Sequence, residues 1–176
     1  MELYQASDNL LEPISKVHEW IQEAQQNGAA LPHAMNISSI NFEGKPSSRM
    51  VLLKRIGQEE FVFFTDYHGN KGKQIIKSPY VALNFWWAKT NKQIRIEGKC
   101  SKTTDKENDE YFSSRPRGSQ ISASVSLQSE EIDSYESLVE RSEEFESSHT
   151  GKDIMRPERW GGFILEPQSI EFWVDQ

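Results

Sequence analysis

The sequence predicts a mainly β protein with some α structure: an antiparallel, Greek-key-like barrel with peripheral helices. Short runs rich in β-branched and aromatic residues follow one another through residues 34–103, with polar turns between them. Helical periodicity precedes these runs in residues 1–30 and follows them in residues 104–148. Strand patterns return in residues 160–176, so strands from both parts can close a barrel around which the helices pack.

Residues 1–30 carry the signals of one amphipathic helix. Pro13 suits a first helical turn, where its missing N–H is not needed, and Gly28 can end the helix. The apolar residues at helical spacing are Ile14, Val17, Ile21 and Ala24.

Residues 34–103 predict a meander of antiparallel strands. Gly57 breaks the pattern, and the lysine-rich piece "GNKGKQIIKSP" interrupts it with a short helical pattern. Ile94 and Ile96 alternate with charged neighbours, which indicates one buried and one exposed face. The expected strands are "AMNISSI", "SRMVLLK", "EFVFFTD", "YVALNFWWA" and "KQIRIEGKCSK".

Residues 104–148 predict helices, and residues 160–176 predict two short strands, "WGGFILEP" and "SIEFWVD". Thr104 can cap the first helix, which has acidic residues in its first turn. The second helical pattern has one apolar stripe. Its many acidic residues we interpret as a solvated face. The stripe consists of Ile132, Tyr135, Leu138, Val139 and Phe145.

Composition limits the function classes. At 176 residues the chain suits one domain, 1–176, with a substantial core. A net charge of -7 argues against a nucleic-acid binder, and the longest apolar runs are too short to span a membrane. No charged start leads into an apolar segment, so we expect no secretory signal. The single Cys100 indicates a reducing compartment, and we expect a cytoplasmic protein. The four histidines lack metal-ligand spacing, so we expect no metal site.

The segment 111–129, "YFSSRPRGSQISASVSLQS", stands out in this acidic chain. It holds Arg115 and Arg117 among many hydroxyl groups and contains no carboxylate. Guanidinium groups and hydroxyls are the donors that match phosphate oxygens. A flexible polar loop is the simpler alternative, because serine-rich stretches with proline and glycine often form loops. The segment by itself leaves both interpretations open.

An ordered set of motifs between about Pro32 and Trp173 resembles the pyridoxamine 5'-phosphate oxidase family. The motifs are "RMVLLK", "FFTDYHGNKGKQI", "ALNFWW", "KQIRIEGKCSK", "YFSSRPRGSQISA", "LQS" and "WGGFILEPQSIEFW". The resemblance implies an FMN-binding split barrel and a homodimer with FMN at the subunit interface. It also implies that the chain oxidises a small molecule, pyridoxamine or pyridoxine 5'-phosphate, to pyridoxal 5'-phosphate with oxygen as acceptor.

The resemblance also assigns site residues, without a catalytic side chain, because the flavin carries the reaction. The FMN contacts look like Arg49, Met50, Val51, Leu52, Leu53, Lys54, Phe64, Thr65, Lys71, Gln93, Gln128, Ser129 and Trp173. The substrate contacts look like Lys54, Tyr111, Arg115 and Ser119. Tyr111, Arg115 and Ser119 are spaced four residues apart, so on a helix they would share one face. Arg117 lies off that face, and we expect it to be exposed to solvent or to make a structural contact within the protein.

Three departures from the family pattern leave other functions open. The Arg-Leu-His-Asp-Arg segment that commonly follows "IEFW" is absent, and the N-terminal arm that contacts substrate in some members has no counterpart. Asn70 stands where a basic cofactor contact is frequent. The alternatives are a split-barrel flavin oxidoreductase with another substrate and a non-catalytic protein that binds FMN or pyridoxal phosphate.

Overall fold

The computed structural model describes residues 1–5 and 9–175, which form two compact units. The barrel unit comprises Met1–Phe64, Gln74–Ser101 and Phe163–Gln176. The helical unit comprises Thr65–Lys73 and Lys102–Gly162. The single domain, 1–176, that is expected from the sequence stays a prediction.

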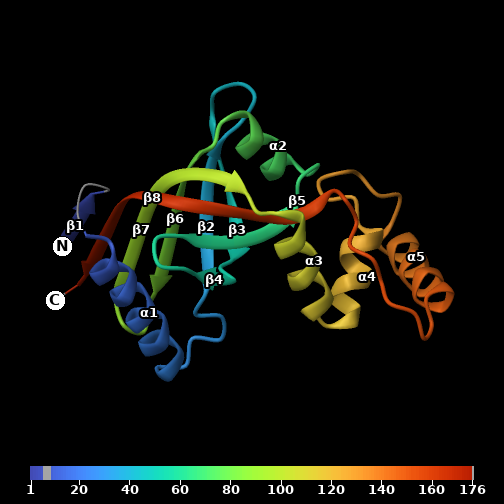
Figure 1. The fold of residues 1–176 in the computed structure, drawn as a ribbon, viewed down its shortest axis with the longest axis horizontal. Coiled ribbons are helices and arrows are strands. Elements are labelled where there is room, and N and C mark those ends of the chain that lie inside the picture. Colours follow the sequence, from blue (N-terminus) through green and yellow to red (C-terminus); the bar gives the residue numbers. More distant parts are fainter. Residues whose placement is uncertain (6–8, 176) are drawn as a thin grey trace. The chain divides into compact units, whose positions relative to one another are not determined.

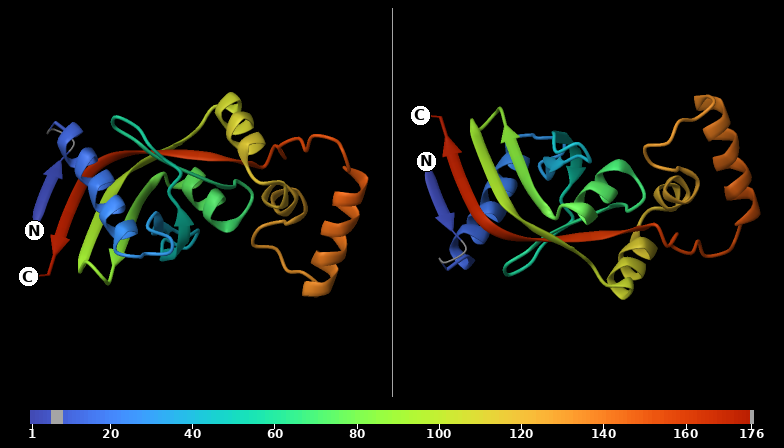
Figure 2. Two further views of the ribbon diagram at one scale, coloured as in Figure 1. Left: turned by 90° about the horizontal axis from the view of Figure 1, so that it is seen from below. Right: turned by 90° about the horizontal axis from the view of Figure 1, so that it is seen from above.

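The barrel unit contains most of a strongly curved antiparallel sheet, with strand order β3-β2-β6-β7-β8-β5-β4 and β1 paired to β8 (Figures 1 and 2). The strands are β1 (Glu2–Gln5), β2 (Ala34–Ile40), β3 (Pro46–Leu52), β4 (Arg55–Ile56), β5 (Phe61–Asp66), β6 (Tyr80–Trp87), β7 (Lys92–Lys102) and β8 (Trp160–Val174). The predicted mainly β, antiparallel barrel with helices is therefore confirmed.

The period-two pattern in β7 sets the core of this sheet. Ile94 and Ile96 are fully buried, whereas Arg95 and Glu97 are exposed, as the sequence predicted. Close strand packing also requires Gly98 in β7, because a Cβ atom there would lie 2.2 Å from the main-chain oxygen of Glu166 in β8. The sheet thus depends on one position where no side chain fits.

Replacing Gly98 by alanine is therefore expected to lower the free energy of unfolding by about 1 to 3 kcal/mol, the usual cost of overpacking. Thermal denaturation measures the loss. Gly118→Ala is the matched control, because nothing lies within 4 Å of a Cβ at that helical position. We expect the control to be neutral or slightly stabilising. Equal melting temperatures for Gly98→Ala and the parent would contradict the packing argument.

Helix α1 (Leu11–Gln26) closes one part of the barrel unit and confirms the predicted N-terminal helix. Trp20 packs edge-on against Phe172 of β8, with ring centroids 5.1 Å apart. Gly28 follows the helix with φ +79°, a conformation that favours glycine. The short β1 was not predicted; it pairs with the last part of β8, so both ends of the described chain lie side by side (Figure 1).

The remaining helices are α2 (Asn70–Lys77), α3 (Asp105–Ser114), α4 (Arg117–Val125) and α5 (Tyr135–Ser148). The predicted cap of α3 is confirmed: Thr104 Oγ1 accepts from the amide of Glu107, and the Glu107 carboxylate accepts from the Thr104 amide. No helix among residues 1–5 and 9–175 is long and apolar enough to cross a membrane.

Two expectations for the C-terminal half are wrong. The predicted strands "WGGFILEP" and "SIEFWVD" are one continuous strand, β8, which passes through Pro167. The apolar stripe of the last helix is not buried, since α5 has no buried residue and Tyr135 is 72% exposed. Ile132 lies before the helix begins. The periodicity of the sequence predicted the helix, but it could not predict how much of the helix surface is buried against the rest of the helical unit.

Candidate functional site

Four of the predicted FMN contacts lie together in the helical unit, and we call them the Lys71 cluster: Thr65, Lys71, Gln128 and Ser129. Lys71 Nζ donates to Thr65 Oγ1 at 2.7 Å and to Gln128 Oε1. Thr65 Oγ1 also donates to Gln128 Oε1 at 3.1 Å. Ser129 Oγ accepts from the amide of Asn70 at 3.1 Å. Residues 63 positions apart in the chain therefore form one polar group.

Two glycines that the sequence interpretation did not single out allow this cluster to form. A Cβ at Gly69 would lie 3.0 Å from Gln128 Oε1, so a side chain there would push the amide away. A Cβ at Gly72 would lie 2.5 Å from the main-chain oxygens of Asp66 and Tyr67. The two glycines of "GNKG" were a sequence signal for this close approach, because positions where the chain packs against a backbone require glycine.

A second polar group, the Arg49 cluster (Ser39, Ser47, Arg49 and Gln74), lies in the barrel unit. Arg49 Nη1 donates to Ser39 Oγ at 2.7 Å, and Nη2 donates to Ser47 Oγ at 2.6 Å and to Gln74 Oε1 at 2.8 Å. Ser39 in turn donates to Gln74 at 2.8 Å. Sequence reasoning predicted Arg49 but missed its buried partners Ser39 and Gln74, whose roles depend on tertiary contacts.

The Arg49 cluster has the electrostatics of an anion site. All three acceptors of the guanidinium are neutral, and no carboxylate forms an ion pair with it within the described parts of the chain. Burial lowers the pKa of Arg49, but arginine stays protonated at neutral pH. A half-buried positive charge with only neutral partners favours a bound anion.

The rest of the predicted stretch from Met50 to Lys54 divides between surface and core. Met50 is 62% exposed and Leu53 is 5% exposed. Val51 and Leu52 are half-buried, and Lys54 is exposed. The amides of Leu53 and Lys54 bond to carbonyls of His33 and Val62, so this stretch is fixed at its end. The Leu53 side chain belongs to the core, and any ligand contact there must use the main chain.

The other predicted cofactor contacts in the barrel unit lie in separate places. Gln93 Nε2 donates to Asn84 Oδ1 at 2.6 Å across β7 and β6. Trp173 lies beside Trp86, with ring centroids 6.2 Å apart. Phe64 is half-buried in β5. Trp86 is 50% exposed, so it is not a core residue of this chain.

Tyr111 and Arg115, two predicted substrate contacts, meet at Trp160 in the helical unit. The Tyr111 ring stacks on Trp160 at 6.1 Å and 12°, and the Arg115 guanidinium lies 4.6 Å above the same indole. Arg115 Nη1 is buried and has no hydrogen-bond partner within the described residues. Burial lowers the pKa of Arg115, against the opposite effect of Tyr111, and burial raises the pKa of Tyr111. A buried donor without a partner is costly, so this nitrogen favours an acceptor.

The helical argument for these residues is wrong, although the structure brings two of them together. Helix α3 ends at Ser114, Arg115 is extended at φ −74° and ψ 150°, and α4 begins at Arg117. Pro116 explains the break, because a residue before proline is disfavoured in the α conformation. Ser119 therefore lies on another helix than Tyr111, and Trp160 is what joins Tyr111 and Arg115.

Arg117 has the structural contacts expected of it. Its Nη1 donates to the carbonyl of Lys152 at 3.0 Å, and its Nη2 donates to the carbonyl of His149 at 2.6 Å. These bonds fix the chain that follows α5. Ser119 is half-buried in the first turn of α4, and its amide bonds to the carbonyl of Pro116.

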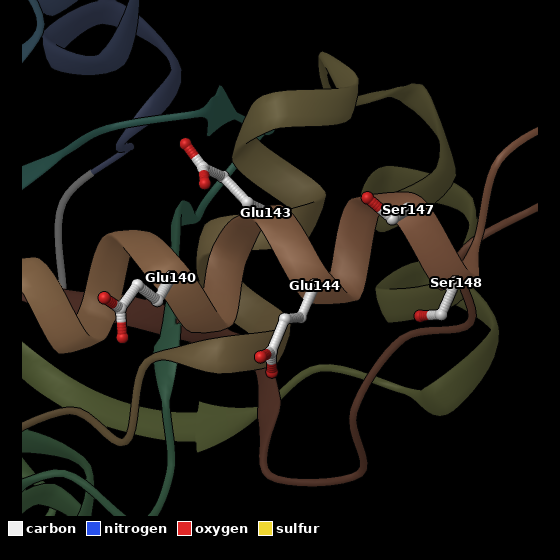
Figure 3. A pocket seen from close by; sticks show the side chains of 5 residues that line it. All are labelled: Glu140, Glu143, Glu144, Ser147 and Ser148. Carbon is white, nitrogen blue, oxygen red and sulfur yellow. The ribbon is translucent and has the colours of Figure 1, made fainter.

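A pocket of about 530 Å³ along α5 does not suit a phosphate ligand (Figure 3). Its lining consists of Glu140, Glu143, Glu144, Ser147 and Ser148. Three carboxylates repel an anion, and none of the predicted site residues lines the pocket. No group of three or more His, Cys, Asp or Glu side chains that could hold a metal occurs in residues 1–5 and 9–175.

Each unit by itself offers groups that suit a flavin nucleotide. Cationic groups in the Arg49 and Lys71 clusters suit a phosphate, and amides such as those of Gln93 and Gln128 can both donate to and accept from a flavin ring. The side chains of the Arg49 and Lys71 clusters can bind and orient a ligand by charge and hydrogen bonding, and these two clusters contain no pair of a nucleophile and its base.

Comparison with known proteins identifies the family. The family model described as pyridoxamine 5'-phosphate oxidase matches residues 21–149. A pyridoxine/pyridoxamine 5'-phosphate oxidase of Psychromonas ingrahamii is 44% identical over 162 residues, which cover 92% of this chain and 75% of the relative. The protein of the same name from Rubrobacter xylanophilus is 42% identical over 162 residues, with the same coverage.

Solved structures share the fold. PhzG from Burkholderia lata, solved with tetrahydrophenazine-1-carboxylic acid, has a TM-score of 0.89 and 27% identity, covering 97% of this chain and 83% of PhzG. A pyridoxamine 5'-phosphate oxidase-related, FMN-binding protein from Nostoc punctiforme has a TM-score of 0.70 at 12% identity, covering 95% of this chain and 85% of its own. The expected split-barrel fold is thus confirmed. The chain belongs to the pyridoxamine 5'-phosphate oxidase family, whose members are flavoprotein oxidoreductases.

Proposed function

We propose that the protein is an FMN-dependent oxidase that converts pyridoxamine or pyridoxine 5'-phosphate to pyridoxal 5'-phosphate, with oxygen as acceptor. The observation that carries this proposal is Arg115, whose buried Nη1 lacks a partner and whose guanidinium is held over Trp160. A substrate phosphate can accept from that nitrogen. Relatives at 42% and 44% identity that bear this enzyme name support the same substrate class.

FMN is the proposed cofactor, and the cations proposed to contact it are Arg49 and Lys54 in the barrel unit and Lys71 in the helical unit. The neutral partners of Arg49 keep its charge available to an anion. Thr65 and Gln128 orient Lys71 by hydrogen bonds, which lowers the entropy that the lysine loses on binding. The remaining predicted FMN contacts stand as proposals with them. When bound, the flavin supplies the hydride acceptor and the route of electrons to oxygen.

In this proposal the chain's own residues bind and orient the substrate. Arg115 and Ser119 donate to the phosphate, and Tyr111 donates its hydroxyl, since burial keeps its pKa above the ordinary value. The Tyr111–Trp160 stack gives the site one rigid wall. Rate acceleration then comes mainly from proximity and orientation, for which no nucleophilic side chain is needed.

We also propose a cytoplasmic homodimer built from single-domain subunits. The sequence contains one cysteine, Cys100, as is usual in a reducing compartment, and burial raises the pKa of its thiol to about 12, so the thiol reacts poorly. Large apolar side chains are exposed in the barrel unit, among them Met50, Tyr80 and Trp86, and a second subunit would cover such residues. Sedimentation at several protein concentrations measures the assembly.

A second candidate is oxidation of a partly reduced polycyclic acid, favoured by the likeness to PhzG at a TM-score of 0.89. The two candidates differ in the anion that they require. A pyridoxamine phosphate oxidase must hold a phosphate dianion at Arg115, whereas the ligand named with PhzG is a carboxylic acid.

The test is anaerobic mixing of FMN-loaded protein with pyridoxamine phosphate, with a carboxylate-bearing dihydro-heterocycle in a parallel sample. We expect the visible flavin absorbance to bleach with the phosphate substrate and to return when oxygen is admitted, with pyridoxal phosphate as product. Bleaching by the carboxylate alone would favour the second candidate. Tight FMN binding without bleaching in either sample would favour a non-catalytic binding protein, and failure to take up FMN would overturn the cofactor proposal.

A further inference from the structure

We propose that Arg159 is a positioning residue for the Lys71 cluster, acting through Asp66 and through the end of α4. None of these groups belongs to the predicted binding site. The inference rests on the proposed function in one respect, namely that the Lys71 cluster contacts FMN.

The first part of the argument is the contact of Arg159 with the last turn of α4. Arg159 Nη2 lies within hydrogen-bonding distance of three carbonyl oxygens, those of Ala123 at 3.0 Å, Ser124 at 2.8 Å and Ser126 at 3.2 Å. Carbonyls at a helix end lack partners within the helix and carry a partial negative charge, so a cation there stabilises the end. Arg159 thus fixes the chain two residues before Gln128.

The second part is an ion pair on the other side of the cluster. Arg159 Nε donates to Asp66 Oδ2 at 3.0 Å, and the side chains are 18% and 6% exposed. Asp66 directly follows Thr65, and its Oδ1 accepts from the amide of His68 at 2.7 Å. The carboxylate therefore fixes the turn that leads from Thr65 to Lys71.

One guanidinium consequently holds both chain segments that form the cluster. Thr65 lies near the end of β5 and Lys71 lies in the first turn of α2, whereas Gln128 and Ser129 follow the end of α4. The second segment needs such support, because Gln128 and Ser129 are exposed and Ser129 has φ +72°, which is uncommon outside glycine. The main chain adds one further link, from the amide of Tyr67 to the carbonyl of Arg159 at 2.6 Å.

Arginine suits this role better than lysine. Its planar fork presents Nε to the carboxylate and Nη2 to the carbonyls at fixed angles, whereas a lysine ammonium is a single point charge on a flexible stem. Removal of either partner leaves a buried charge without its counterion, so the pair is sensitive to substitution.

The experiment compares Arg159→Met with the parent and with Arg156→Met. Arg156 is a matched control three residues earlier: it forms ion pairs with Asp105 and Asp109 at 3.0 and 2.6 Å and donates to the carbonyl of Trp160 at 2.7 Å. It contacts no member of the Lys71 cluster. The first measurement is the FMN dissociation constant, and the second is amide hydrogen exchange of residues 66–71 and 126–130 in the flavin-free protein.

We expect Arg159→Met to weaken FMN about tenfold or more, as loss of one hydrogen bond to a charged group would. We also expect faster exchange in both segments, partial rescue by Arg159→Lys, and no change of either readout in Arg156→Met. Asp66→Asn should weaken FMN in the same direction, and its combination with Arg159→Met should cost less than the sum of the two effects.

The inference is overturned if exchange in the two segments is unchanged in Arg159→Met, or if Arg156→Met changes both readouts to the same extent. The exchange measurement separates this inference from the proposed function. A parent protein that takes up no FMN contradicts the proposed function, whereas faster exchange confined to Arg159→Met still supports the positioning role.

Discussion

Arg115→Ala is expected to weaken the binding of pyridoxal 5'-phosphate by about 1.5 to 3 kcal/mol, the usual contribution of hydrogen bonds to a charged group. This corresponds to roughly ten- to a hundredfold in the dissociation constant. The reason is that Arg115 combines a buried Nη1 that lacks a partner with a rigid position over Trp160, so its donors are prepared for a phosphate. Isothermal titration of FMN-loaded protein with the product measures the change.

Arg117→Ala is the matched control for this experiment. Arg117 lies two residues away and carries the same charge, but it donates to the carbonyls of Lys152 and His149 and so has a structural role. We expect the product affinity of Arg117→Ala to stay within about twofold of the parent. The reason is that salt screens a nearby charge that makes no direct contact with the ligand. FMN affinity should be nearly unchanged in both variants. Product binding by Arg115→Ala equal to that of the parent would mean that segment 111–129 is merely polar structure.

The architecture could be predicted from the sequence wherever a local pattern was strong. Alternation in β7, the lysine-rich turn of α2 and the cap of α3 all identified their elements. The four-residue β1 was missed because its strand conformation depends on pairing with β8. The bounds of α4 within the helical region 104–148 were not predicted, because "RGSQISASV" contains several weak helix formers and no charge pattern, so tertiary contacts determine it.

The candidate site was predictable only in part, since spacing cannot indicate partners that are distant in sequence. The resemblance proposed Arg49 as a cofactor contact, but nothing in the sequence marked Ser39 and Gln74 as its hydrogen-bond acceptors. The pair of Asp66 and Arg159 spans 93 positions, and no local pattern links them. Helical spacing correctly grouped Tyr111 with Arg115 but for the wrong reason, because Pro116 ends the helix and the indole of Trp160 brings the two together.

Arg49→Ala should act on the cofactor and leave the substrate groups intact. The variant removes a half-buried cation whose three acceptors are neutral, and with it the charge that we propose for the FMN phosphate. We expect FMN affinity to fall by about 1.5 to 3 kcal/mol, or roughly ten- to a hundredfold. Quenching of flavin fluorescence on binding measures the dissociation constant, and flavin content after purification should fall in parallel.

Arg95→Ala separates this effect from a general loss of positive charge. Arg95 lies in β7 of the same unit, but it is exposed and paired with Glu97 at 3.0 Å and with Glu171 at 3.2 Å. Exposed ion pairs of this kind contribute about 0 to 1 kcal/mol to stability, so Arg95→Ala should leave the fold intact. Because Arg95 is not one of the proposed FMN contacts, FMN affinity should be nearly unchanged. Arg49→Lys tests geometry: lysine keeps the charge but cannot reach three acceptors from one plane, so an intermediate affinity is expected. If Arg49→Ala retained parental FMN affinity while Arg95→Ala lost it, the phosphate would have to bind near β7, and the assignment of Arg49 would be wrong.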